Sequence, residues 1–143
     1  MVEVKKEVAA MKKICQVFLL LWVFLVGFSS FCSAEHWMSL PGVDDDAQLF
    51  FDGDSAWIDP ISRNGGVNEK FVWPKDGKSA IIDVQFHLDL DADEADVTFG
   101  RVRLYNTTGH QIGEHYLGRH EKFSDGSIGF TQIIKIASYA IDK

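Results

Sequence analysis

Four closely spaced aspartates are the residues of this chain best suited to bind a cation. They are Asp89, Asp91, Asp93 and Asp96. Carboxylates at this spacing could converge on one calcium ion, which takes about six to eight oxygen ligands in proteins. The run does not match an EF-hand loop, because its sixth position is Glu94 instead of glycine and its twelfth is Gly100 instead of glutamate. A solvated turn whose charges discourage strand-edge pairing is therefore favoured over a calcium site.

A tryptophan and an arginine form the second candidate site. Trp57 lies between acidic residues in the segment Asp54-Ser-Ala-Trp-Ile-Asp59, just before Pro60. An exposed tryptophan in a polar loop is a common anchor for protein or sugar contacts. We therefore expect a binding surface formed by loops around Trp57 and Arg63, together with an exposed sheet face or edge. Burial of Trp57 in the core is the alternative, because large rings bury the most area.

The sequence contains no recognisable catalytic motif. It has no G-x-S-x-G nucleophile elbow, no P-loop and no dinucleotide-binding fingerprint. His115 and His120 are five residues apart, which places them on opposite faces of a regular strand, so a zinc site is not expected. We therefore expect no enzymatic activity and no cofactor, with calcium as the one open possibility.

Residues 1–34 have the three parts of an export signal. Lys12 and Lys13 precede an apolar run from Val17 to Phe28, and small residues lead to Ala34. This pattern predicts cleavage before Glu35, and Met11 is the hypothetical true start of translation. The apolar run is shorter than the roughly 20 residues of a membrane-spanning helix, so no span is expected after cleavage. A retained membrane anchor is the alternative.

Cleavage would change the charge and the redox chemistry of the chain. Both cysteines, Cys15 and Cys32, leave with the signal, so the remaining domain, residues 35–143, would have no disulfide. Four lysines and two glutamates leave as well, which changes the net charge from −7 to −9. Such an acidic surface repels phosphate backbones, so nucleic acid is not an expected partner. A basic partner, a cation or a neutral ligand such as a glycan is compatible with it.

Alternation of apolar and polar residues predicts an antiparallel sheet in residues 35–143. The clearest case runs from Ile82 to Leu90, where every second side chain is apolar. The acidic run 91–96 is expected to form the following turn. Further strands are expected at 37–40, 48–51, 67–73, 98–105 and 111–118. Turns are expected at 41–42, 52–53, 64–66, 75–78 and 106–109.

The C-terminal segment has the spacing of an amphipathic helix. Its apolar stripe would consist of Phe130, Ile133, Ile134, Ala137 and Ile141. A strand over 131–136 is the alternative, since that stretch is rich in β-branched residues. The helix is favoured, because a sheet with one apolar face needs a cover. The expected fold is therefore mainly β (α+β), an antiparallel sheet of about six strands with a short C-terminal helix.

The order of several landmarks points to a family. Trp37 is followed by Phe50-Phe-Asp-Gly-Asp-Ser55, by Arg63, by Val72-Trp73 and by Tyr105 four residues before Gly109. This order resembles the surface-adhesin protein E family of small exported bacterial proteins over residues 37–112. Many members have a cysteine pair that ties the C-terminal segment to the sheet, and residues 35–143 lack it. The resemblance implies an antiparallel sheet with a C-terminal helix, and adhesion to host or matrix proteins.

The expected function is that of an exported, non-enzymatic binding module in the bacterial periplasm, at the cell surface or secreted. Its partner would be an extracellular or envelope protein or glycan. The alternative is a small acidic calcium-binding envelope protein that uses the four aspartates.

Overall fold

The computed structural model describes residues 36–42 and 46–143, which belong to a compact unit spanning Glu35–Lys143. The predicted export signal and the hypothetical start at Met11 lie outside the described residues. The described chain forms seven strands and one helix. The elements are β1 (Trp37–Leu40), β2 (Gln48–Asp52), β3 (Trp57–Ile58), β4 (Asn64–Trp73), β5 (Lys78–Asp89), β6 (Glu94–Tyr105), β7 (Gln111–Ser124) and α2 (Ile128–Asp142).

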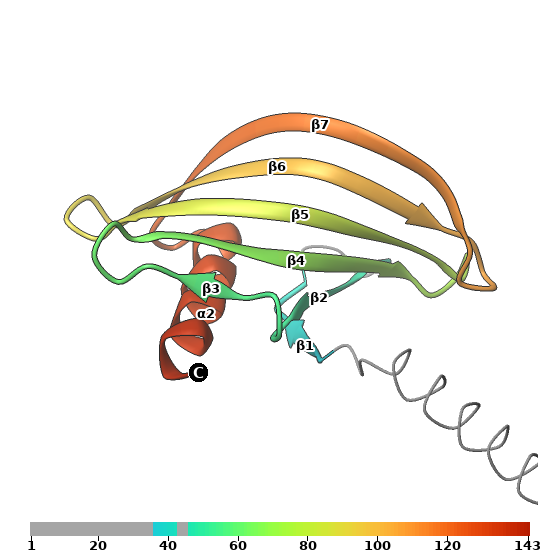
Figure 1. Cartoon of the computed structure of the whole chain (residues 1–143), viewed down its shortest axis with the longest axis horizontal. Helices are drawn as coiled ribbons and strands as arrows, with labels where there is room; N and C mark the ends of the chain where they lie inside the picture. Colours follow the sequence, from blue (N-terminus) through green and yellow to red (C-terminus); the bar gives the residue numbers. More distant parts are fainter. Residues whose placement is uncertain (1–35, 43–45) are drawn as a thin grey trace, which may run out of the picture. The chain divides into compact units, whose positions relative to one another are not determined.

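All strand pairs are antiparallel, in the order β1-β2-β4-β5-β6-β7, and β3 pairs with β4. The expected mainly β fold with a C-terminal helix is thereby confirmed. The long strands β4 to β7 arch over α2 (Figure 1). We call the sheet face that packs on α2 the inner face and the opposite one the outer face.

The core lies between the inner face and the helix. Val84, Phe86 and Leu88 alternate along β5 and pack in one cluster with Ile133 and Ile136 of α2. The polar residues between them lie on the outer face. The alternation in the sequence therefore predicts correctly which side of β5 is buried.

Helix α2 begins at a side-chain cap and is tied to the first strand by hydrogen bonds. Ser127 Oγ accepts a hydrogen bond from the backbone N–H of Phe130 at 3.1 Å. Gln132 Nε2 donates to the carbonyl of Pro41 and Lys135 Nζ to the carbonyl of Ser39, both at 2.8 Å. These contacts and the apolar stripe hold the helix on the sheet without a disulfide.

The apolar stripe of the helix differs from the predicted one at two positions. Ile136 is fully buried, whereas Ile141 is 62% exposed. The buried side passes through Ile133, Ile136 and Ala137, and in the last turn Ala140 packs against the core in place of Ile141. The prediction for Ile141 was therefore wrong.

The segment 64–66 was predicted to be a turn but forms the start of β4. Its two glycines make room for rings on both sheet faces. A Cβ on Gly65 would lie 2.3 Å from the ring of buried Phe86, and one on Gly66 would lie 2.6 Å from Trp57 Nε1. The glycines are thus explained by close packing inside a strand.

The acidic run was also predicted to be a turn over its whole length, but the turn ends at Asp93 and β6 begins at Glu94. Ala95 is fully buried opposite Leu88, which extends the alternation of β6 toward the turn. The small apolar side chain of alanine gave too weak a signal. Leu90, predicted to be on the buried face, lies beyond the end of β5 and is about half exposed.

Strand β7 is longer than predicted and forms one edge of the sheet. Most of its side chains are exposed, so that the sequence shows no regular apolar alternation. The pairing with β6 shifts register opposite Leu117 and Gly118, and Gly118 has a φ of 57°. This irregularity interrupts the edge strand near its middle.

Candidate binding groove on the outer sheet face

A row of residues crosses the outer face at right angles to the strands. Trp57 pairs with Gly66, Gly66 with Gln85, Gln85 with Thr98, and Thr98 with His120. Directly paired residues of antiparallel strands project to the same face. The row therefore brings together side chains from β3, β5, β6 and β7 that are up to 63 positions apart in the sequence. We call these five residues the transverse row.

Two adjoining hollows lie along the transverse row. The larger has a volume of about 430 Å³ and is lined by Trp57, His87, Asp96 and His120, among others. The smaller, of about 200 Å³, reaches Arg101 and Tyr116. Both are lined by Gln85 and Thr98, so they form one continuous depression, which we call the outer groove.

Two glycines lie beside the aromatic rings at the ends of the groove. Gly66 carries no side chain below the Trp57 indole, which is 51% exposed. Gly100 lines the smaller hollow, where a Cβ would lie 3.7 Å from the ring of Tyr116. Tyr116 is 79% exposed. The groove thus has an accessible aromatic ring at each end and polar groups between them.

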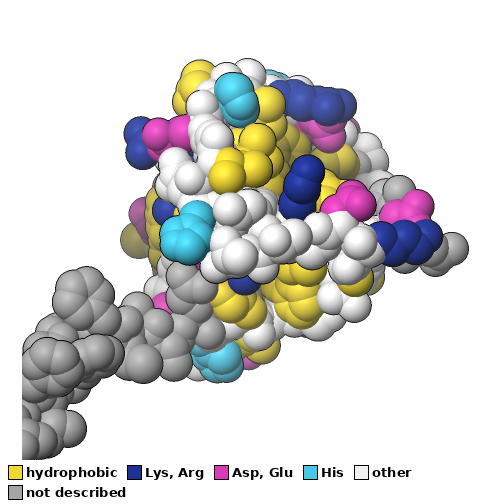
Figure 2. Space-filling model, turned by 90° about the vertical axis from the view of Figure 1, so that its right-hand side faces the viewer, with side chains coloured by type: hydrophobic (Ala, Val, Ile, Leu, Met, Phe, Trp, Pro, Cys, Tyr) yellow, Lys and Arg dark blue, Asp and Glu magenta, His cyan; other side chains and the backbone are white. Residues whose placement is uncertain are grey.

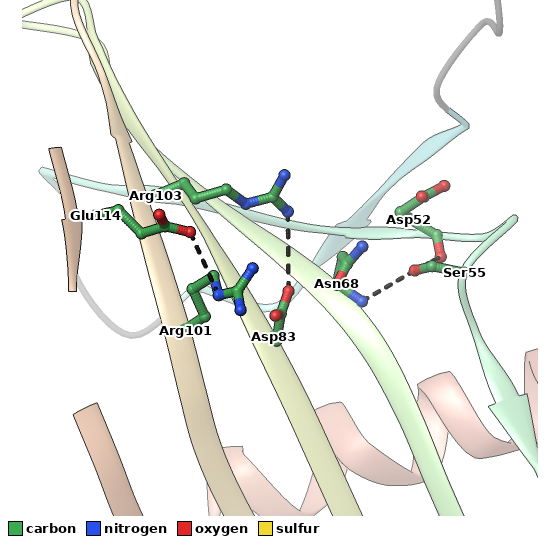
Figure 3. A network of polar contacts seen from close by, with 7 residues as sticks. All are labelled: Asp52, Ser55, Asn68, Asp83, Arg101, Arg103 and Glu114. Carbon is green, nitrogen blue, oxygen red and sulfur yellow. Dashed lines mark hydrogen bonds and ion pairs between the residues drawn. The ribbon is translucent and has the colours of Figure 1, made fainter. Parts of the chain in front are cut away.

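The segment before Trp57 is fixed to the sheet through Ser55, which Figure 3 shows with the neighbouring ion pairs. The backbone N–H of Asn68 donates to Ser55 Oγ at 2.9 Å, and Ser55 Oγ donates to the carbonyl of Asp52 at 3.0 Å. On the other side of Trp57, Asp59 Oδ1 accepts from the backbone N–H of Ile61 at 2.9 Å. This hydrogen bond, with those from Ser62, lowers the pKa of the Asp59 carboxyl.

Imidazole, amide and hydroxyl groups make hydrogen bonds within the larger hollow. His87 Nδ1 lies 2.8 Å from Asn64 Oδ1, and His120 Nδ1 lies 3.2 Å from Thr98 Oγ1. In each of these contacts the imidazole nitrogen donates or accepts according to the tautomer of the ring. His120 Nε2 lies 3.8 Å from Asp96 Oδ1, which is an ion pair when the histidine is protonated.

Two arginines of β6, of which Arg101 lines the smaller hollow, are paired with carboxylates. Arg101 Nε lies 3.3 Å from Glu114 Oε1, and Arg103 Nη2 lies 3.7 Å from Asp83 Oδ1 (Figure 3). Their charges are therefore largely compensated on the sheet surface. The groove is polar without a net cationic character.

Of the two predicted binding residues, the structure places one in the outer groove. Trp57 lines the groove, although it lies in the short strand β3 and not in a loop as predicted. Arg63 lies in the turn before β4, with a φ of 61°, and its carbonyl accepts from the backbone N–H of Leu88 at 3.0 Å. Its neighbour Asn64 lines the groove, but Arg63 does not.

The four aspartates run from Asp89 at the end of β5, through the turn, to Asp96 inside β6. Asp89 Oδ1 accepts from the backbone N–H groups of Asp91 at 3.2 Å and Ala92 at 3.1 Å. Asp93 has a φ of 52°, and Asp96 lines the outer groove. Among residues 36–42 and 46–143, no three His, Cys, Asp or Glu side chains are grouped to hold a metal ion. The calcium hypothesis stays a prediction.

Sequence reasoning missed the convergence of His87 and His120 in one hollow. The two histidines come together through the β5–β6 and β6–β7 hairpins. His87 pairs with Asp96 and His120 pairs with Thr98, which is two residues from Asp96 on the same face of β6. His115 lies opposite Val102, which is buried, and does not line this hollow.

A buried carboxyl group was missed as well. Glu69 lies on the inner face of β4, opposite Phe51 and Ile82, and is 3% exposed. Burial raises the pKa of its carboxyl to about 7. Its position two residues from both Val67 and Phe71 was the available signal, since residues i and i+2 of a strand share a face.

A third hollow of about 260 Å³ lies at the end of the sheet where β4 and β6 end, and it is lined by Trp73, Leu104 and Ile112, among others. Trp73 stacks on Phe71 with 6.3 Å between ring centroids. Figure 2 looks onto this end, where apolar side chains are visible between charged ones. Asp76, Lys78, Ser79 and Tyr105 also line this hollow, although its accessible lining is mainly apolar.

Comparisons with protein-family models, with curated proteins and with solved structures found no significant match to this chain. In the described part of the chain, no helix has both the length and the apolar character needed to cross a membrane.

Proposed function

We propose that this protein is an exported, non-enzymatic binding module of the bacterial periplasm or cell surface. It contacts a protein or glycan partner through the outer groove, in the manner of the surface-adhesin E proteins that its sequence resembles. The observation that carries this proposal is the half-exposed indole of Trp57 at one end of a polar groove. Large aromatic side chains in such positions supply much of the binding energy at protein interfaces.

The rest of the groove supports binding through side chains. The backbone groups below it are used in the pairing of β4, β5, β6 and β7, so they are not available to an added strand. The indole is held by the bonded loop before it and by close contact with Gly66. A site whose groups are already fixed loses little conformational entropy when a ligand binds.

The net charge narrows the class of partner. With a charge of −7 for the whole chain, or −9 after the proposed cleavage, the protein attracts basic partners and does not repel neutral ones. Adhesion to matrix glycoproteins is compatible with this balance, and nucleic-acid binding is disfavoured.

Biolayer interferometry of the purified protein on immobilised fibronectin and basement-membrane extract tests the proposal. We expect binding that falls about tenfold or more in Trp57→Ala, because an aromatic anchor is lost. Ile112→Ala is the matched control, since Ile112 is an exposed apolar residue that does not line the outer groove. Equal binding by the wild type and Trp57→Ala would contradict the proposed site.

A further inference from the structure

We infer that the outer groove binds a neutral oligosaccharide, with one sugar ring against the Trp57 indole and the chain following the groove toward Tyr116. This inference rests on the proposed function and names the ligand class of the same groove.

The hydrogen-bonding groups of the groove match those of a sugar. Asn64 and Gln85 carry amides that donate and accept, Thr98 carries a hydroxyl, and both imidazoles add further sites. The hydroxyl groups of a sugar also donate and accept, so each finds a complement. In the described part of the chain the Gln85 side chain makes no hydrogen bond and is exposed, so its amide is available to a ligand.

The aromatic rings complete this arrangement. The Trp57 indole and the Tyr116 ring are both largely accessible, and each presents an apolar surface beside polar groups. The C–H face of a sugar ring packs on such a surface while its hydroxyls reach the neighbouring amides. Two separate rings suit a ligand with more than one sugar.

The length of the groove also favours a ligand with more than one sugar ring. The transverse row crosses from β3 to β7 through four strand-to-strand steps. At about 4.8 Å per step the row spans roughly 19 Å, which is longer than a monosaccharide.

Other ligand classes fit the groove less well. An anionic ligand would meet the carboxylates of Asp83 and Asp96, while Arg101 and Arg103 are already paired. An apolar ligand would find only two separated rings. An extended peptide could not add to the sheet here, because the site is on a face and not along an edge.

A glycan array with neutral, sialylated and sulfated oligosaccharides, including chitotriose, maltotriose and lacto-N-tetraose, is the first test. We expect the purified protein to retain neutral oligosaccharides in preference to their monosaccharides. Gln85→Ala and Trp57→Ala should each weaken binding about fivefold or more, whereas Ile112→Ala should not. Gln85→Ala is included because it removes an exposed side chain and is expected to keep the fold. Absence of binding to any neutral oligosaccharide on the array would overturn the inference.

Fibronectin before and after enzymatic deglycosylation separates this inference from the proposed function. Loss of binding on deglycosylation, together with loss in Trp57→Ala, is the expected result. Binding that survives deglycosylation but needs Trp57 would overturn the sugar ligand and leave the binding module intact. Binding that is unaffected by either change would overturn both.

Discussion

Glu69 couples the stability of this protein to pH at the scale of one residue. Its carboxyl lies in the core against Phe51 and Ile82, and burial raises its pKa from the ordinary value of 4.5 to about 7. The folded state therefore holds a proton that the unfolded state releases between these two values. The contribution of this bound proton to the free energy of unfolding is fully present below pH 4.5 and is lost as the pH rises through about 7.

We expect the free energy of unfolding to fall with pH in the wild type but not in Glu69→Gln, which cannot ionise. Between pH 4.5 and about 7, the raised pKa of Glu69 should lower the free energy of unfolding of the wild type, relative to that of Glu69→Gln, by on the order of 3 kcal/mol. Urea unfolding at a series of pH values measures it for both proteins. Glu114→Gln is the control, because Glu114 is an exposed residue of β7. Parallel pH curves for the wild type and Glu69→Gln would contradict the assignment.

The glycine pair at the start of β4 gives a second prediction at this scale. Gly65→Ala places a Cβ 2.3 Å from the Phe86 ring and 2.7 Å from the backbone oxygen of Trp57, neither of which can move freely. We expect a loss of about 2 kcal/mol or more in stability, measured by thermal melting. In Gly66→Ala the added Cβ would contact only the Trp57 side chain. This variant should therefore lose less stability than Gly65→Ala but bind more weakly in the groove. An unchanged melting temperature in Gly65→Ala would show that Phe86 has room to move.

The candidate site could be predicted from the sequence only where a residue stood out from its local surroundings. Trp57 did so, because an aromatic residue among acidic ones points to the surface. Gln85, Thr98 and His120 did not, since their importance arises from strand pairing between distant segments. Glu69 was hidden because a charged residue is normally assigned to a wet face.

At the scale of elements, helix α2 depends on its N-terminal cap. Ser127 Oγ satisfies the backbone N–H of Phe130, and no acidic residue lies in the first turn to support the helix dipole. We expect Ser127→Ala to lower stability by about 1 kcal/mol. Ser138→Ala, at an exposed position inside the helix, is the control and should be neutral or slightly stabilising. Thermal melting compares the two, and equal effects would contradict the capping role.

The turn between β5 and β6 is stabilised by its own carboxylate. Asp89 Oδ1 already accepts two backbone N–H groups, so the turn is closed without a cation. We therefore expect calcium to leave the melting temperature of the protein unchanged. Differential scanning fluorimetry with calcium and with a chelator measures this. A calcium-dependent rise that is lost in Asp89→Ala would instead support the calcium-binding alternative.

The elements themselves were predicted where one strong pattern dominated. The alternation of β5 and the helical spacing after Ser127 each identified an element correctly. The extent of β7 and the start of β6 were not predicted, because exposed side chains and a small alanine weaken the alternation on which such predictions depend. The short β3 exists only through its pairing with Gly65 and Gly66.

At the scale of the whole molecule, export with cleavage before Glu35 would determine the final chemistry of the protein. The sequence predicts cleavage before Glu35, which removes both cysteines. Expression of the full chain in a bacterial host, followed by intact-mass measurement of the periplasmic fraction, should give a chain that starts at Glu35 and contains no free thiol. Recovery of the unprocessed chain from the membrane fraction would instead support a retained anchor.

The irregular centre of β7 has a consequence for how concentrated solutions of this protein behave. The open edge of this fourteen-residue strand would otherwise be a template to which folded copies could add and form polymers. Gly118, with its positive φ, divides that template into two shorter runs that cannot both align with a regular neighbour. The backbone conformation of one glycine therefore favours a protein that stays dispersed at high concentration.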